Sequence, residues 1–195
     1  MIKEDKFIHA KRKGKGKDKK KNKPEKTPEQ LNAAQGKFSF TEINGFKLKE
    51  VEWTVPDQKT RKRRRHAFNK VREEFLRHIG ATMEPALRDM GLTDKQIEQV
   101  KKGSAPNGYN VHHKLPIHGG GENVFSNLIL MPIKPHDELH HKVMDPQVAQ
   151  MQTGESKKVM IPWTDDMVYV DPERKKSQPQ KAVIAAKLMG KHLGR

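Results

Sequence analysis

Six of the ten histidines of this 195-residue chain lie within residues 107–141. The stretch reads NGYNVHHKLPIHGGGENVFSNLILMPIKPHDELHH. His112 and His113 are adjacent, whereas His136 and His140 are four residues apart. Neutral imidazole serves both as a metal ligand and as a base near pH 7. The residue types and spacing of this stretch therefore suit metal binding and proton transfer.

Two strands and a helix are expected to position these histidines. The segments YNVHH (109–113) and LILMPI (128–133) are expected to be strands, with a Gly-rich loop at 119–123 between them. Pro135 suits the first turn of a helix that continues through HDELHHKVM (136–144). The stretch therefore predicts a strand–strand–helix unit.

The expected geometry divides the histidines between two tasks. His136 and His140 share one face of the predicted helix, whereas His141 points roughly 140° away from His136. Neighbouring side chains of a strand point to opposite faces. One of His112 and His113 can therefore join the helical pair in a metal site, and the other can face a phosphodiester and water. Three protein ligands with an open position are typical of a catalytic metal site.

The charge of the chain favours polyanionic partners. The net charge is +16, and residues 1–65 carry 21 Lys and Arg against 9 Asp and Glu, a net of +12. Such an excess suits nucleic acid, acidic proteins or anionic lipid, although a solubilising tail or a localisation signal has the same composition. The chain has no cysteine, which excludes disulfides, thiolate metal sites and cysteine nucleophiles.

The chain divides into four parts by composition. Residues 1–35 are expected to be a disordered basic tail, because KRKGKGKDKKKNKPEK lacks apolar periodicity. Residues 36–57 are expected to be an arm or short hairpin that turns at Asn44 and Gly45. Residues 58–175 are expected to form the folded domain, and residues 176–195 a C-terminal tail or helix.

Helices are expected ahead of the histidines and a strand pair after them. A long helix should begin near Gln58 and end at Gly80, followed by helices at 83–90 and 93–103. VMIPW and MVYVD are expected to form a small strand pair. The predicted fold class is α+β, with a helical segment packed on the strand–strand–helix unit.

The histidine stretch resembles the active-site segment of the HNH, or ββα-metal, endonucleases. VHHKLPIHGGGENVFSNLILMPIKPHDELHH is most similar to the DNase domains of colicins and pyocins and to related bacterial polymorphic-toxin nucleases. The resemblance covers about a quarter of the chain, from Leu92 to Val143, with the ββα-metal motif at 109–143. It implies the following roles: one divalent metal ion (Mg, Mn, Ni or Zn) on His112, His136 and His140, a general base at His113, and a loop-positioning role for Asn127.

The chain departs from the colicin pattern at one position. An acidic residue two before the HisHis pair is expected to orient a phosphate-binding arginine, and here that position holds Asn110. Such an arginine must come from elsewhere, and His118 and His141, which lack family counterparts, are expected to be accessory or surface residues. The nucleic-acid-binding candidates are Arg61, Lys62, Arg63, Arg64 and Arg65.

Together these patterns predict a metal-dependent endonuclease that hydrolyses DNA with low sequence specificity, as a bacterial toxin or effector. A non-catalytic, metal-stabilised nucleic-acid-binding module and an RNase on the same scaffold are the alternatives. The resemblance also implies an acidic immunity protein as a partner. No apolar run approaches 18 residues and no secretory signal begins the chain. A soluble protein is therefore expected, in the cytoplasm of a producing or target cell or exported without a signal peptide.

Overall fold

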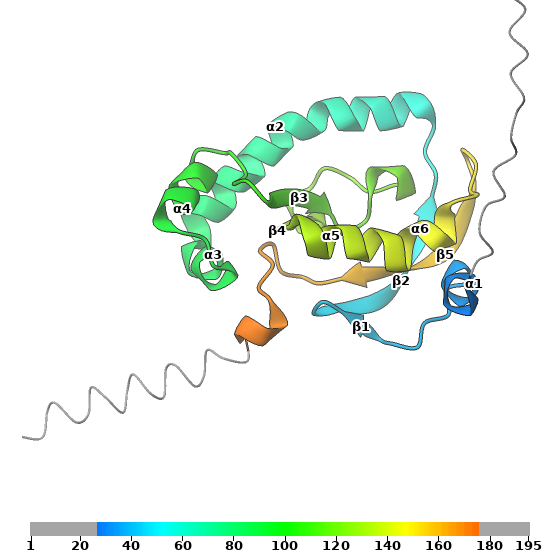
Figure 1. Cartoon of the computed structure of the whole chain (residues 1–195). Helices are drawn as coiled ribbons and strands as arrows, with labels where there is room; N and C mark the ends of the chain where they lie inside the picture. The colour runs from blue at the N-terminus through cyan, green and yellow to red at the C-terminus, as the bar shows by residue number, and fades with distance from the viewer. Residues whose placement is uncertain (1–26, 176–195) are drawn as a thin grey trace, which may run out of the picture.

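The computed structural model describes residues 27–175, which combine helices and strands in an α+β arrangement (Figure 1). The helices are α1 (Pro28–Ala34), α2 (Gln58–Thr82), α3 (Glu84–Met90), α4 (Asp94–Lys101), α5 (Ile133–Leu139) and α6 (Asp145–Val148). The strands are β1 (Glu42–Ile43), β2 (Phe46–Thr54), β3 (Tyr109–His113), β4 (Leu128–Pro132) and β5 (Ser156–Trp163). Short 3₁₀ turns η1 (Ile117–Gly119) and η2 (Phe125–Asn127) and a π-turn, η3 (His140–Met144), complete the described part. None of its helices has the length and apolar character needed to cross a bilayer.

The predicted hairpin is present, but it is not a separate arm. Asn44 and Gly45 have φ angles of 50° and 81°, as a two-residue hairpin turn requires. β2 then pairs with β5 along eight residues, so it is the central strand of a sheet in the order β1-β2-β5. Phe46 and Trp53 are buried from this strand. The segment expected to be an arm is therefore part of the core.

Two other expectations about the outer segments are wrong. The predicted tail at 1–35 is wrong for residues 28–34, because a capping box between Thr27 and Gln30 begins α1 there. The predicted pairing of VMIPW with MVYVD is absent from the described residues, since the first segment pairs with β2 and Val168 forms a lone parallel bridge with Leu130. The expected tails at 1–26 and 176–195 lie outside the described residues.

Helix α2 contains the basic segment and passes the glycine predicted to stop it. The carboxylate of Asp57 caps the helix by accepting a hydrogen bond from the Thr60 amide, so the basic residues lie in its first turns. Gly80 does not end the helix; a Cβ there would lie 2.8 Å from the backbone of Lys101. This glycine lets α2 and α4 pack closely. The predicted short helices are confirmed, with α3 ending at Gly91 in the left-handed region.

The β3–β4 hairpin lies between two sets of helices (Figure 1). The strands are antiparallel, with His112 opposite Ile129. His113 contacts Phe68 of α2 on one side, at 4.3 Å between ring centroids. His112 contacts His136 of α5 on the other side, at 4.8 Å. Adjacent histidines of one strand thus face different helices, as the alternation of strand side chains dictates.

Candidate metal centre and active site

Three histidines from three elements form a cluster that can hold a metal ion. His112 comes from β3, His136 from α5, and His140 begins the π-turn. Each offers one ring nitrogen, and these nitrogens all lie within 4.8 Å of one another. No further His, Asp or Glu side chain joins this group among residues 27–175. The strand and the helical segment that follows therefore bring together the three predicted ligands.

The charge state of the cluster suits a cation. Burial lowers the pKa of His112 well below its ordinary value of 6.5, and the neighbouring histidines lower it further. Burial likewise lowers the pKa of His140, and His136 adds to the effect, while Asp145 opposes it. Both rings are therefore neutral at pH 7, which is the form that binds metal.

Carboxylates lie behind two of the three rings. The Nδ1 atom of His136 is 2.9 Å from Asp137, and that of His140 is 3.5 Å from Asp145. A carboxylate at Nδ1 fixes the ring orientation and leaves Nε2 with the lone pair for a metal. Asp145 also approaches His141, at 3.3 Å. His141 itself is 77% exposed.

A π-turn explains why Asp145 lies beside His140. The amide of Asp145 donates to the carbonyl of His140, five residues before it, so the helix is widened at this point. Pro146 follows immediately; its ring has no N–H for the carbonyl four residues earlier and would clash with it in an α-helix. The proline therefore favours the wider turn, which brings residues five apart onto one side.

His113 contacts α2, lines the same hollow as the cluster and has a fixed tautomer. Its Nε2 lies 2.8 Å from the side-chain oxygen of Asn123. The amide nitrogen of Asn123 donates to the main-chain carbonyl of Arg64, at 2.8 Å, so the oxygen of Asn123 must be the atom that faces His113. Nε2 therefore carries the proton and donates it, which leaves the lone pair on Nδ1. Burial also lowers the pKa of His113, so the ring is a neutral base at pH 7.

Asn127 holds the loop between the strands. Its side-chain oxygen accepts from the amide of Leu115, at 2.8 Å, and its nitrogen donates to the carbonyls of Leu115 and Glu122, each at 3.0 Å. Gly121 is needed beside it, because a Cβ there would lie 1.7 Å from the carbonyl oxygen of Leu115. Asn127 thus closes the Gly-rich loop.

The basic residues of α2 have different surroundings. Arg64 donates to the carbonyls of Gly120 and Gly121, at 2.7 and 3.0 Å, and pairs with Glu122, so it binds the loop rather than facing solvent. Arg65 lines the same hollow as the histidines, which has a volume of about 190 Å³. Arg61, Lys62 and Arg65 line a second hollow. Arg63 is exposed and lines neither.

His118 and Asn123 are two residues whose positions the sequence did not indicate. His118 was expected to be accessory or on the surface, yet it lines the hollow with the three clustered histidines. Its ring contacts the edge of Trp53 at 4.8 Å, and burial lowers its pKa. Asn123 fixes the tautomer of His113. The only signal for either lay in their positions beside the Gly-rich loop.

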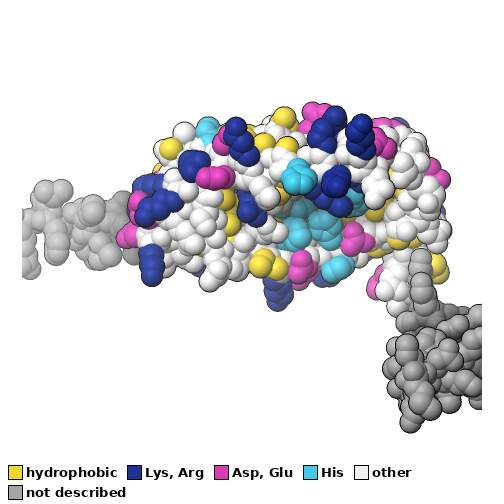
Figure 2. Space-filling view, turned by 90° about the horizontal axis from the view of Figure 1, so that it is seen from above, with side chains coloured by type: hydrophobic (Ala, Val, Ile, Leu, Met, Phe, Trp, Pro, Cys, Tyr) yellow, Lys and Arg dark blue, Asp and Glu magenta, His cyan; other side chains and the backbone are white. Residues whose placement is uncertain are grey.

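The histidine face is basic around its hollow. Figure 2 shows histidine side chains gathered at the centre of this face, with Lys and Arg side chains near them and a smaller number of acidic ones. A candidate metal site with cations near it suits an anionic substrate.

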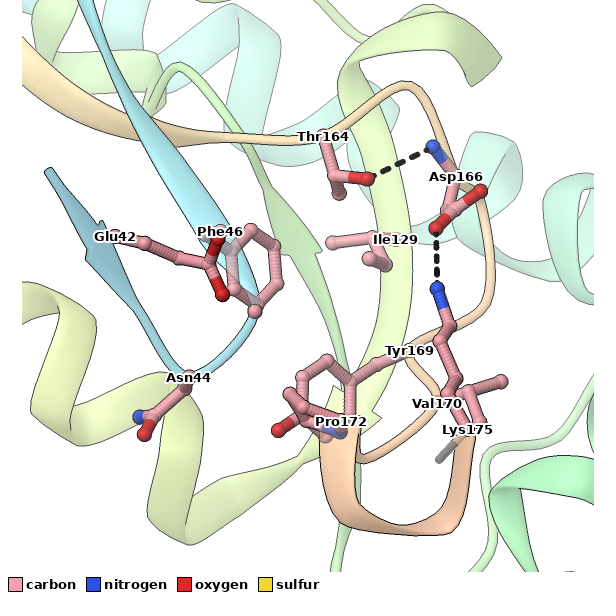
Figure 3. A pocket seen from close by; sticks show the side chains of 11 residues that line it. Glu42, Asn44, Phe46, Ile129, Thr164, Asp166, Tyr169, Val170, Pro172 and Lys175 are labelled. Atoms are coloured by element: carbon pink, nitrogen blue, oxygen red, sulfur yellow. Dashed lines mark hydrogen bonds and ion pairs between the residues drawn. The ribbon is translucent and has the colours of Figure 1, made fainter. Parts of the chain in front are cut away.

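A further hollow, of about 190 Å³, lies beside β4 and is lined by Phe46, Ile129 and Tyr169 (Figure 3). Asp166 there pairs with Lys175 at 3.2 Å, and its amide donates to Thr164. Phe46 and Tyr169 stack at 5.6 Å. Burial raises the pKa of Tyr169 to about 12, so its hydroxyl stays neutral. Paired charges and stacked rings make this hollow a packing feature rather than a reactive site.

Sequence comparison gives one relative and no function. Over 137 residues, 69% of its length, the chain is 30% identical to the uncharacterized protein YhhZ of Escherichia coli (strain K12). The match covers 34% of that protein, so the chain spans about a third of its length. No family model and no solved structure matches the chain. The assignment of function therefore depends on the residues and their geometry.

Proposed function

We propose that the chain is a metal-dependent endonuclease of the HNH type that hydrolyses phosphodiester bonds of DNA. The observation that carries the proposal is that three clustered histidines, a neutral fourth histidine with a fixed tautomer and an arginine line one hollow. A metal site with a purely structural role needs only the three clustered histidines. A hydrolytic site also needs a base and a cation beside it, and His113 and Arg65, which line the hollow, would supply them.

The proposed roles follow from the contacts. His112, His136 and His140 hold one divalent ion. Such an ion, when bound, neutralises charge on the phosphate and the leaving oxygen. His113 takes a proton from the attacking water at Nδ1, because its Nε2–H is held by Asn123. General-base catalysis of this kind contributes about 10²–10⁴-fold.

The remaining roles concern the loop and the substrate. Asn127 keeps the loop in place. Arg65 binds the phosphate beside the cluster, since it is the arginine that lines this hollow. A bacterial toxin or effector role, with an acidic immunity protein covering the basic face, extends the proposal through the resemblance of the histidine stretch to colicin DNases.

Plasmid nicking tests the proposal. The full chain is incubated with supercoiled plasmid and Mg²⁺, Mn²⁺, Ni²⁺ or Zn²⁺, with and without EDTA. Cleavage that EDTA abolishes is expected for the wild type. His113→Ala is expected to lose cleavage and keep metal binding, whereas His136→Ala loses both. His141→Ala is the matched control, because this exposed histidine lies one residue beyond the cluster.

The outcomes separate the alternatives. Metal binding and DNA binding without cleavage under any of the four metals would make the chain a metal-stabilised binding module. Cleavage of structured RNA in preference to the plasmid would make it an RNase. Equal cleavage by the wild type and His113→Ala would refute the role of the base.

A further inference from the structure

The first turns of α2 form a second hollow beside the metal cluster. Its volume is about 530 Å³, and it is lined by Gln58, Arg61, Lys62, Arg65 and His66. These positions follow the spacing i, i+3, i+4, i+7 and i+8, which is one face of an α-helix. One helical face therefore supplies the whole lining, and three of the five side chains are cations at pH 7.

This hollow adjoins the metal cluster through a shared residue. Arg65 lines both hollows, and Arg61 lies one helical turn before it. Four residues of α-helix advance about 6 Å along the axis, which is of the same order as the span of one nucleotide along a strand. The two arginines are thus spaced to contact neighbouring phosphates of one strand.

Arg61 has hydrogen-bonding capacity that the protein does not use. Its Nε is one of two buried side-chain nitrogens without a hydrogen-bond partner in the described part of the chain. A buried donor without a partner costs free energy, and a rotation of the Arg61 side chain, which lines the hollow, would bring this N–H to an anion there.

We infer that the Arg61–Lys62 hollow is a subsite for the phosphate next to the one that is cut, so that the preferred substrate is a nucleic-acid strand with at least two consecutive phosphates. The inference rests on the proposed nuclease function and adds a substrate requirement to it. Arg65 binds the phosphate that is cut, Arg61 and Lys62 bind the flanking one, and Arg64 takes no part because the loop carbonyls occupy it.

Substrates with one and two phosphates test the inference. Bis(p-nitrophenyl) phosphate and a dinucleotide carry a single phosphodiester, whereas a trinucleotide carries two. The wild type, Arg61→Gln and Lys62→Gln are assayed on all three. Gln keeps most of the side-chain length and removes the charge. Lys70→Gln is the matched control, because Lys70 lies on the same helix, is 83% exposed and pairs with Glu74.

The expected result is a selective loss. Arg61→Gln and Lys62→Gln lower kcat/KM for the trinucleotide by about tenfold each, which corresponds to about 1.4 kcal/mol. Their hydrolysis of bis(p-nitrophenyl) phosphate and of the dinucleotide equals that of the wild type. An equal loss on all three substrates, or no loss on the trinucleotide, would overturn the inference. If the wild type hydrolyses none of the three with any metal, the nuclease function fails instead.

Binding without catalysis gives a second readout. Fluorescence anisotropy of a labelled 12-mer is measured in EDTA at several salt concentrations, since the slope of log K against log[salt] counts phosphate contacts at about 0.7–0.9 per contact. The double variant Arg61→Gln/Lys62→Gln is expected to lose about one contact. A slope equal to that of Lys70→Gln would contradict the flanking-phosphate contact even if cleavage falls.

Discussion

The hydrogen bond between His113 and Asn123 allows the base to be tuned by one substitution. Asn123→Asp replaces the neutral acceptor 2.8 Å from Nε2 with a carboxylate of the same shape. An anion there stabilises the imidazolium, so the pKa of His113 rises. In the wild type, burial lowers that pKa below 6.5 and the Asn123 hydrogen bond only partly opposes this effect.

The magnitude follows from the proximity and burial of the pair. His113 is 9% exposed, and an opposite charge in contact with a titrating group changes its pKa by about 1–3. The base must be neutral to act, so the acid limb of kcat/KM moves to higher pH by the same amount. At a pH below the His113 pKa of both proteins, the variant is slower by about tenfold for each unit by which its His113 pKa exceeds that of the wild type. Above both pKa values the two proteins converge.

The assay is the pH dependence of kcat/KM for bis(p-nitrophenyl) phosphate between pH 5.5 and 9.5, with the metal held saturating. Asn123→Ala is the control, because it removes the acceptor without adding charge. It is expected to be slower at every pH, with no alkaline displacement of the limb. The reasoning is refuted if Asn123→Asp has the acid limb of the wild type, or if an NMR titration of His113 in the metal-free protein shows no rise in its pKa.

Four further results are expected. Asn127→Ala leaves three main-chain groups of the loop without their partner, so urea titration should show a loss of about 2–4 kcal/mol, whereas an unchanged midpoint would contradict the loop role. Gly121→Ala places Cβ against the Leu115 carbonyl and should lower Tm more than Gly154→Ala, whose Cβ would meet open space and whose only cost is its positive φ. Because His112 and His140 have lowered pKa values in the folded protein, the unfolded chain binds more protons below pH 6.5. The metal-free protein should therefore lose stability as pH falls from 6.5 to 5. A thermal-shift profile that stays flat over this range would count against the buried neutral rings. Saturating Zn²⁺ or Ni²⁺ should raise Tm, and His136→Ala should abolish the rise while His141→Ala preserves it.

The sequence predicted the arrangement of the histidines where short-range geometry decides the outcome. The four-residue spacing of His136 and His140 and the alternation of His112 and His113 are backbone periodicities. The structure places His112, His136 and His140 together and turns His113 toward α2. The roles of all four as ligands and base remain predictions.

Long-range packing explains what the sequence did not predict. Pairing of β2 with β5 joins residues more than 100 positions apart, and no local pattern in either strand specifies that partner. Gly80 was predicted to end a helix, but its role is to leave room for the backbone of Lys101. Lys101 belongs to another helix, so the local sequence around Gly80 does not reveal this contact. Lys114 is 1% exposed and donates to the carbonyl of Ser126, although lysine is rarely buried.

The position of Arg64 has a consequence for redesigning this site. Its guanidinium binds the Gly-rich loop, while its main-chain carbonyl accepts from Asn123 and so determines which nitrogen of His113 is protonated. The contact with the loop is made by the side chain and depends on the residue type, whereas the contact with Asn123 is made by the main chain and does not. Substitution at position 64 therefore changes the loop alone, whereas a one-residue insertion or deletion upstream in the helix would rotate the carbonyl by about 100° and change the tautomer of the base. Engineering that alters the length of α2 before this point should be avoided, even where side-chain exchanges are tolerated.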